Sequence, residues 1–186
     1  VAAGMVYFFS GAARQQLRAE IEAQFAKFIA TGLALDHVNG HLHFHLHPAV
    51  FGILRANATD WRIRAMRLTY DPPRIDWPLG HGRWFYRAGH AFIFRLLSRR
   101  ARPALHPRKI AFTPFVFGLL ENARVTEDYV LKLLPRLPEG DSELYSHPSL
   151  DEFKHEFDAL ISPRVVESVR RESIQLIRYQ DLWRDY

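Results

Sequence analysis

The sequence predicts an α/β fold whose sheet is largely parallel. Short apolar stretches of strand length alternate along the chain with longer stretches of helical periodicity, and strands that alternate with helices pair in parallel. Two of the expected strands end in histidine-bearing loops, which is where α/β folds build their sites. The length of 186 residues suggests a single domain, residues 1–186. Apolar residues make up 48% of the chain, which is enough for a packed core.

The first element is predicted to be one amphipathic helix at residues 12–30. Ser10 is a suitable N-cap, and Gly32 can end the helix in a left-handed conformation. Apolar residues recur between them at helical spacing, with polar residues on the other positions. They are Leu17, Ile21, Phe25 and Phe28. We expect this helix to be a scaffold element.

A strand, a histidine-rich loop and a second helix are expected next. Residues 33–38 read as a short buried strand, which Asn39 and Gly40 interrupt. Pro48 suits the first turn of a helix that continues to residue 58. Residues 61–68 then form another predicted strand.

The second half continues the alternation. We expect a loop at residues 76–87, a basic amphipathic helix at 91–102, an extended segment at 110–117, a helix capped by Thr126 that ends near residue 134, a strand at 143–145, a helix or loop at 151–160, a helix at 163–171 and a last strand at 174–177.

Composition narrows the classes of function. The chain has no cysteine, which excludes disulfides, thiolate metal sites and a cysteine nucleophile, and this fits the cytoplasm. A net charge of +5 is mild, and no nucleic-acid motif accompanies the arginines, so we expect no nucleic-acid partner. No apolar run is long enough to span a bilayer, and no signal peptide is visible. The chain starts with Val1, which is consistent with a processed protein, a fragment or a misassigned start.

Histidines are concentrated in residues 35–48, which hold five of the ten in the chain. In an extended segment, the alternation of His41, His43, His45 and His47 places all four imidazoles on one face. In a helix, His41 and His45 become i,i+4 neighbours, a usual spacing for two metal ligands. The pattern favours a metal or catalytic site; zinc, nickel and iron all suit imidazole. A solvated strand face and a surface cluster without function are the alternatives.

Three further residues fit such a site. Arg67, at a predicted strand end, could clamp a carboxylate, a phosphate or a sugar hydroxyl, or be a surface charge. Asp36 could accept a hydrogen bond that orients a histidine ligand. His147 follows the predicted strand at residues 143–145. Two histidine-bearing strand ends suit metal-assisted hydrolysis, in which a second group delivers a proton to the leaving group.

The histidine-rich segment carries a resemblance to a known family. Residues 36–48 read Asp-His-Val-Asn-Gly-His-Leu-His-Phe-His-Leu-His-Pro, which resembles the motif of the YdjC-like carbohydrate deacetylases, and most of all their hopanoid-biosynthesis-associated type, HpnK. Residues 20–28 with 31–33, 117–120 with 124–126, 143–148 and 179–182 resemble the corresponding family segments, so the resemblance covers nearly all of the chain.

The resemblance implies a fold and a reaction. The fold is a distorted (β/α) barrel of the glycoside hydrolase/deacetylase type, here incomplete at the N-terminus. The reaction removes an acetyl group from an N-acetylated sugar, here one on a hopanoid glycolipid, with a divalent metal ion, Mg²⁺ or Zn²⁺. On this basis His41 and His45 are the expected metal ligands, and His147 is the expected proton donor. We also assign Asp36 a catalytic role and expect His43 and Arg67 to contact the substrate.

Two departures from the family keep an alternative open. The family's early Asp-Asp motif and another metal histidine lie upstream of Val1, and Asn39 stands where related chitooligosaccharide deacetylases have aspartate. The alternative is a non-catalytic or truncated relative that binds metal and docks on an anionic lipid surface through the basic helix. That helix carries Arg95, Arg99, Arg100 and Arg102. Peripheral contact with the inner face of the membrane and a homodimer are left open.

Overall fold

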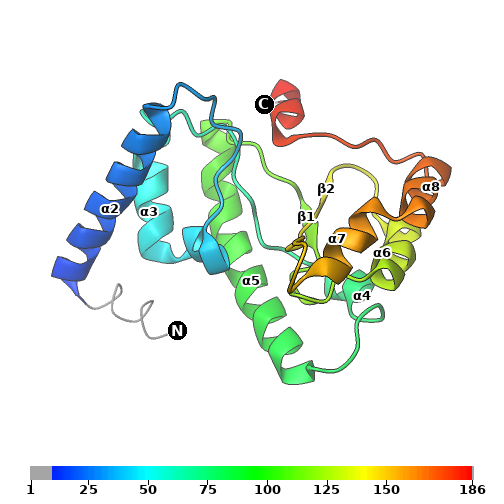
Figure 1. The fold of residues 1–186 in the computed structure, drawn as a ribbon. Helices are drawn as coiled ribbons and strands as arrows, with labels where there is room; N and C mark the ends of the chain where they lie inside the picture. The colour runs from blue at the N-terminus through cyan, green and yellow to red at the C-terminus, as the bar shows by residue number, and fades with distance from the viewer. Residues whose placement is uncertain (1–9, 186) are drawn as a thin grey trace. The chain divides into compact units, whose positions relative to one another are not determined.

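The computed structural model describes residues 10–185 (Figure 1). They form two compact units, each assembled from separate parts of the chain. The first unit contains the segments up to Arg67, Arg99–Phe112 and the segment from Arg178. The second contains Leu68–Ser98 and Thr113–Ile177. Each unit is described by itself below.

The first unit opens with the predicted amphipathic helix. Helix α2 spans Gly11–Ile29, and the side chain of Ser10 accepts a hydrogen bond from the Ala13 backbone N–H at 3.1 Å. Ile21 is buried and lies on the expected apolar stripe. Gly32 follows the helix with φ of 73°, a conformation that costs glycine little. The predicted cap, helix and stop signal are therefore confirmed.

The predicted strands at 33–38 and 61–68 are wrong in length. Only single-residue parallel bridges form there, between Val38 and Met66 and between Ala65 and Ala111. A strand is held by backbone partners on a neighbouring segment, and residues 33–37 have none among the described residues. The pairing that does form is parallel, as the α/β prediction requires.

Two more helices of the first unit lie close to these bridges. The 3₁₀ helix η1 spans His41–Leu46, and helix α3 spans Pro48–Ala56, with Pro48 in its first turn as predicted. Helix α3 buries Val50, Phe51, Ile53 and Leu54. The 3₁₀ helices η2 (His106–Arg108) and η4 (Tyr179–Asp185) also belong to this unit.

Helix α5 spans Trp84–Leu105 and is longer than the predicted basic helix. It begins inside the segment predicted to be a loop, and the short helix α4 (Pro73–Asp76) ends at the other edge of that segment. The loop prediction for residues 76–87 is therefore wrong at both ends. The segment is rich in Trp, Pro and Gly, a composition that favours a loop. The two helix ends within it are stabilised by tertiary contacts of Asp76 and Arg87, which the local sequence does not reveal.

The second unit holds the one regular sheet of the described residues. Strand β1 (Phe115–Phe117) pairs in parallel with β2 (Ser142–Leu144), with Val116 opposite Glu143 (Figure 1). Helix α6 (Glu127–Leu133) and the 3₁₀ helix η3 (Leu134–Arg136) connect the two strands. Helices α7 (Lys154–Ile161) and α8 (Pro163–Arg171) follow. The predicted parallel pairing and the predicted helices are confirmed.

The core of the second unit forms where these helices meet β1. Its buried residues include Phe117, Val125, Val130, Leu133 and Val165. Thr126 caps α6 by accepting from the Tyr129 N–H at 3.3 Å, and Ser162 caps α8 by accepting from Arg164 at 3.2 Å. The last predicted strand, at residues 174–177, is wrong: the segment is irregular, and Leu176 is exposed.

A buried charge cluster ties α4, α5 and α6 together within this unit. Arg87 is fully buried and donates to the Gly80 carbonyl at 3.1 Å and to the Asp76 carbonyl at 3.0 Å. Its Nε lies 3.1 Å from Glu121 Oε1, and Tyr129 donates to Asp76 Oδ1 at 2.5 Å. A Cβ on Gly80 would lie 1.8 Å from Glu121 Oε1, so only glycine fits this close approach.

Asp71 is the third carboxyl group of the cluster. It accepts from the Leu120 N–H at 3.3 Å, while its other oxygen is buried without a hydrogen-bond partner. Burial, together with the neighbouring Asp76, raises the pKa of Asp71 well above 3.8. Burial also raises the pKa of Asp76 and Glu121. One buried guanidinium thus faces three carboxyl groups, and the folded protein favours their protonated forms more than the unfolded chain does.

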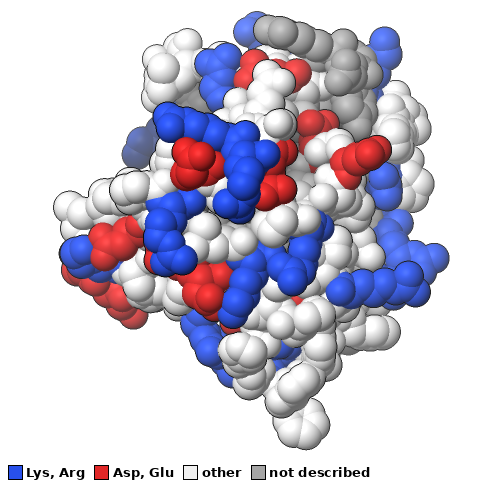
Figure 2. All heavy atoms as spheres, turned by 90° about the vertical axis from the view of Figure 1, so that its right-hand side faces the viewer, with Lys and Arg blue, Asp and Glu red and all other residues white. Residues whose placement is uncertain are grey.

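The architecture is mixed α/β, rich in helix and with a small parallel sheet. Among residues 10–185, no helix is both long and apolar enough to cross a bilayer. On the face drawn in Figure 2, acidic and basic side chains are interspersed. That face therefore carries no extended field of one sign.

Candidate functional site

The histidine run is neither extended nor α-helical. Its backbone forms η1 with a kink, because Leu42 (φ 51°) and His43 (φ 58°) adopt the left-handed conformation. The kink breaks the regular alternation of side chains, so the four imidazoles do not share one strand face. His41 is exposed, whereas His45 points inward and is buried.

His45 uses both ring nitrogens inside the protein. Nδ1 accepts a hydrogen bond from the Gly40 N–H at 2.9 Å, so Nε2 carries the proton and donates to the Arg67 carbonyl at 2.9 Å. Burial, reinforced by the nearby Arg67 charge, lowers the pKa of His45 from 6.5 to about 4. In this arrangement His45 is a neutral link between the run and the segment that carries Arg67, and no lone pair is left for a metal.

The other histidines of the run differ in their surroundings. His47 caps α3, since its Nδ1 accepts from the Ala49 N–H at 3.3 Å, and its ring stacks on Phe44. The His43 ring lies 6.4 Å from the His45 ring in an edge-on arrangement. The metal contact expected of His41 and the substrate contact expected of His43 stay predictions.

Asp36 contacts a histidine, but it is His37. The two side chains lie 2.8 Å apart, from Asp36 Oδ2 to His37 Nδ1, and His37 Nε2 lies 3.1 Å from the Asn39 side-chain amide. The His37 ring also stacks on Tyr179 at 4.1 Å. Sequence reasoning did not single out His37. A carboxylate beside an imidazole can orient the ring and stabilise its charged form.

Arg67 directly follows the bridge between Val38 and Met66. Its backbone N–H donates to the Val38 carbonyl at 3.1 Å, and its carbonyl accepts from His45. The structure thus brings Arg67, His45 and the start of the histidine run together at the carboxyl end of the parallel bridge. This is the end at which α/β folds build sites.

His147 lies in the loop after β2 and has two defined neighbours within the second unit. Its Nε2 lies 2.6 Å from the Tyr145 hydroxyl, and its Nδ1 lies 3.9 Å from Glu156 Oε2. If the tyrosine donates, Nδ1 carries the ring proton and faces the carboxylate. A phenol on one side of an imidazole and a carboxylate on the other suit a histidine that moves a proton.

Glu156 positions that loop and escaped sequence reasoning. It is fully buried on α7, where Oε1 accepts from the Val125 N–H at 2.9 Å and Oε2 accepts from the His147 N–H. A buried carboxylate that accepts from two loop amides holds both loops in place. The signal in the sequence is a glutamate on the apolar face of a helix, between Phe153 and Leu160.

The described residues do not by themselves form a metal centre. Within residues 10–185, no group of three or more His, Asp and Glu side chains could hold a metal ion. His45 and His47 use ring nitrogens in hydrogen bonds to the backbone. The donor set that the resemblance implies is therefore not assembled by the described part of the chain.

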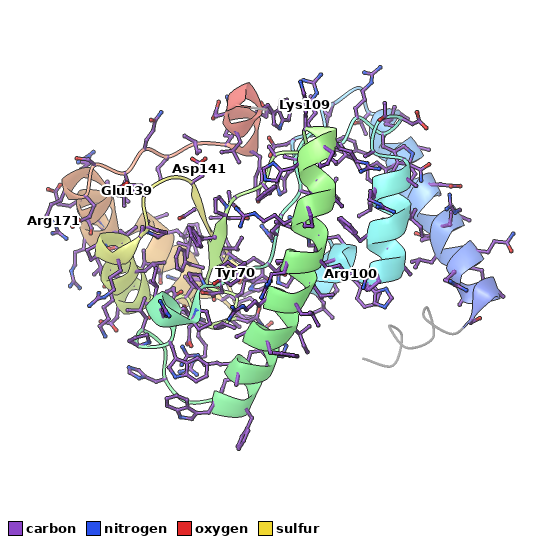
Figure 3. All side chains as sticks on the ribbon, turned by 180° about the vertical axis from the view of Figure 1, so that it is seen from behind. Tyr70, Arg100, Lys109, Glu139, Asp141 and Arg171 are labelled. Carbon is purple, nitrogen blue, oxygen red and sulfur yellow. The ribbon has the colours of Figure 1, made fainter. Side chains whose placement is uncertain are left out.

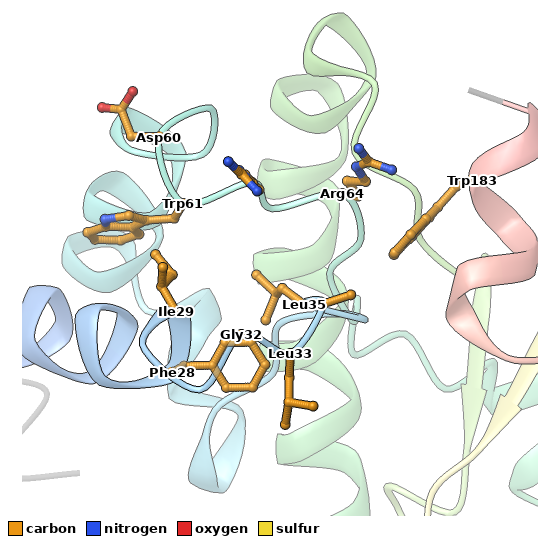
Figure 4. Close-up of a pocket in the computed structure, with 11 residues that line it drawn as sticks. Phe28, Ile29, Gly32, Leu33, Leu35, Asp60, Trp61, Arg64 and Trp183 are labelled. Carbon is orange, nitrogen blue, oxygen red and sulfur yellow. The ribbon is translucent and has the colours of Figure 1, made fainter.

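A pocket of about 350 Å³ lies at the other end of the bridged segments in the first unit (Figure 4). It is lined by apolar and aromatic side chains and by arginine: Phe28, Leu33, Leu35, Trp61, Arg64 and Trp183 among others. Residues 33–35 and 61–64 precede the parallel bridge, whereas the histidine run and Arg67 follow it. The pocket is thus separate from the histidine run.

Comparisons with known proteins agree with the motif. The family model described as YdjC-like protein matches residues 2–171. A carbohydrate deacetylase of Brevibacillus brevis is 33% identical over 66 residues, which cover 36% of this chain and 23% of that protein. A carbohydrate deacetylase of Geobacillus stearothermophilus is 25% identical over 187 residues, which cover 94% of this chain and 62% of that protein. No solved structure gives a significant match.

The chain spans less than two thirds of the length of either relative. The family match, in contrast, runs over most of the chain and includes the histidine run, Arg67 and the loop of His147. This chain belongs to the YdjC-like protein family.

Proposed function

We propose that this chain is part of a hydrolase that removes an acetyl group from an N-acetylated sugar. The observation that carries the proposal is the setting of His147, between a tyrosine hydroxyl at 2.6 Å and a buried carboxylate at 3.9 Å, in a loop after a parallel strand. Two relatives named carbohydrate deacetylase and the family membership support the choice of reaction. The parallel pairing supports a distorted (β/α) barrel as the parent fold.

In this proposal His147 delivers the proton that the amide nitrogen needs when it leaves. As an imidazolium, the ring carries a proton on Nε2, and the Tyr145 hydroxyl next to it gives way to the substrate nitrogen or relays the proton. Glu156 keeps the loop in position through its bond to the His147 backbone N–H. General acid catalysis of this kind contributes about 10²- to 10⁴-fold to the rate.

His41, His43 and Arg67 are proposed to face the substrate side of the first unit. His41 is exposed at the start of the run, and Arg67 lies at the carboxyl end of the bridge. We assign metal contact to His41, in line with the motif, and substrate contact to His43 and Arg67. A divalent ion, Mg²⁺ or Zn²⁺, would polarise the acetyl carbonyl when bound.

The contacts of His45 and Asp36 limit the roles that these residues can take. His45 could act as a second metal ligand only after losing a bond to Gly40 or Arg67. Asp36 acts in this proposal through His37, which it contacts directly. The Asp36 carboxylate orients the His37 ring through Nδ1, while Nε2 lies next to the Asn39 side-chain amide.

The test measures acetate release from an N-acetylated disaccharide by the protein that carries this chain, with Mg²⁺ or Zn²⁺ added. His147→Asn should lower kcat by at least about 100-fold. His81→Asn is the matched control, since His81 is exposed and lies outside both histidine loops, and it should leave the rate unchanged. Full activity of His147→Asn would overturn the role of His147, and no acetate release by the wild type would overturn the deacetylase.

A second experiment separates the metal from the reaction. Zn²⁺ binding followed by calorimetry should weaken in His41→Ala and stay unchanged in His81→Ala. Equal binding by both variants would refute the assignment of His41, whatever the activity shows.

The finer substrate is also a proposal. We infer a hopanoid glycolipid as the carrier of the sugar, and a cytoplasmic enzyme at the inner face of the membrane. The similarity of residues 36–48 to the hopanoid-associated type supports this choice. Higher activity on a water-soluble disaccharide than on a lipid-linked amino sugar precursor would contradict it.

A further inference from the structure

Helix α5 exposes a stripe of large apolar side chains. Phe85, Phe92 and Leu96 are 96%, 70% and 58% exposed, and Ile93 beside them is also exposed. At about 100° per residue, the first three positions lie within about 40° of one another around the helix axis. We call these four residues the α5 stripe. Single exposed apolar residues are common, but three in register on one helix with a fourth beside them are not.

The stripe is not the packing face of the helix. The buried residues of α5 are Arg87, Ser98, Ala101 and Leu105, which project from the opposite side. The helix has therefore already buried one face, and the stripe is a second apolar face that the described residues leave uncovered. An amphipathic surface helix would normally place charged residues there.

Arginines border the stripe without acidic counterparts. Arg95, Arg99 and Arg100 are exposed on α5, and Figure 3 labels Arg100 on this helix. No aspartate or glutamate occurs in residues 77–120, and none of the three arginines forms an ion pair within the described chain.

The exposed arginines of helix α8, in contrast, are paired with glutamates. Arg164, Arg170 and Arg171 are exposed there as well, but each lies within 3.1 to 3.9 Å of a glutamate oxygen. The imbalance on α5 is thus a local feature and not a consequence of the overall composition.

We propose that the α5 stripe docks on an anionic phospholipid surface. The apolar side chains enter the boundary between headgroups and acyl chains, while Arg95, Arg99 and Arg100 bind lipid phosphates. An apolar strip with basic borders and no acidic residue is complementary to such a surface. A protein partner would need a matching apolar groove rimmed by acidic groups. This proposal is independent of the deacetylase reaction.

The test is co-sedimentation of the chain with vesicles of phosphatidylcholine, with or without phosphatidylglycerol. The wild type should bind only the anionic vesicles. Arg95→Gln, Arg99→Gln and Arg100→Gln together should weaken binding about 100-fold, since each basic residue near an anionic surface contributes about fivefold. The control replaces Arg164, Arg170 and Arg171 on α8 by Gln; it removes the same charge and should change binding little.

The apolar contribution is tested separately. Phe92→Ser with Leu96→Ser should weaken binding about tenfold or more at unchanged net charge. In the wild type, brominated phospholipid should quench the fluorescence of Trp84, which is exposed at the start of α5, and Trp84→Phe should lose that quenching. This readout needs no substitution in the stripe itself.

Three results would overturn the proposal. They are equal binding to vesicles with and without phosphatidylglycerol, equal losses in the α5 and α8 variants, and a dimer in lipid-free solution that Phe92→Ser with Leu96→Ser converts to a monomer. The last result would assign the stripe to a second copy of this chain.

Discussion

Replacing His45 with leucine should destabilise the protein at neutral pH and barely do so in acid. The buried ring joins the Gly40 N–H to the Arg67 carbonyl, and leucine can satisfy neither group. Two lost hydrogen bonds of about 1 kcal/mol each, with some cost for the unpaired groups, give a loss of about 2 to 3 kcal/mol in the free energy of unfolding.

The pH dependence follows from the lowered pKa. In the unfolded chain His45 titrates near 6.5, but in the folded protein it titrates at about 4 because it is buried. The stabilisation by the neutral ring is therefore complete above pH 6.5 and is lost as the pH falls toward 4. A shift of this size corresponds to about 3 kcal/mol at 1.36 kcal/mol per pH unit. A leucine does not titrate, so the gap between the two proteins should close in acid.

The assay is urea unfolding of both proteins, followed by tryptophan fluorescence at several pH values between about 7.5 and 4.5. His41→Leu serves as control, because His41 is exposed and should change the free energy of unfolding by less than about 0.5 kcal/mol at any pH. A difference between wild type and His45→Leu that stays constant with pH would refute the buried, neutral role derived for His45.

Three further changes probe the second unit. Arg87→Met should lower the free energy of unfolding by about 3 to 5 kcal/mol, because it leaves buried carboxyl groups without their cation; a loss below about 1 kcal/mol in urea unfolding would contradict the cluster. Asp71→Asn should become more stable relative to the wild type as the pH rises above about 4. The raised pKa means that the folded wild type holds the Asp71 proton more tightly than the unfolded chain does, so the free energy of unfolding of the wild type falls as the pH rises. Parallel curves of stability against pH for the two proteins would count against this. Glu156→Ala should lower the free energy of unfolding by about 2 to 4 kcal/mol and speed hydrogen exchange at the two loop N–H groups that donate to the carboxylate. Unchanged exchange would show that other contacts hold the loops.

The helices could be predicted from the sequence because their signals are local. Ser10, Thr126 and Ser162 each cap the helix expected after them. Each accepts a hydrogen bond from a backbone N–H that lies no more than three residues away. The strands at 33–38, 61–68 and 174–177 failed because pairing depends on segments far away in the chain. The strand near residue 144 succeeded because the segment at residues 115–117 supplies its partner.

The candidate site could likewise be predicted from the sequence only where its signals are local. The clustering of histidine and the position of His147 after a strand were visible in the sequence. The contacts of the side chains were not, since Glu156 on α7 reaches the loop of His147, and Arg67 meets His45 across 22 residues. Arg87 was placed in a loop, although it is the centre of a buried cluster, because nothing local distinguishes a buried arginine from an exposed one.

The alternation of histidines overstates the number of ligands that the run can supply. Alternation makes four imidazoles equivalent only if the backbone is extended, and the left-handed Leu42 and His43 remove that equivalence. Once the run is kinked, His45 links it to the Arg67 segment and His47 caps α3, so both are committed to the backbone. A zinc ion that is held by three protein ligands needs more than the run then offers. A metal centre at this end of the bridge therefore depends either on a rearrangement of the run that frees His45 or on donors from elsewhere. The free energies of unfolding of the wild type and of His45→Leu, measured with and without Zn²⁺, distinguish the two alternatives. If a rearranged His45 binds the ion, the stabilisation by Zn²⁺ should be lost in His45→Leu. If the donors come from elsewhere, that stabilisation should remain.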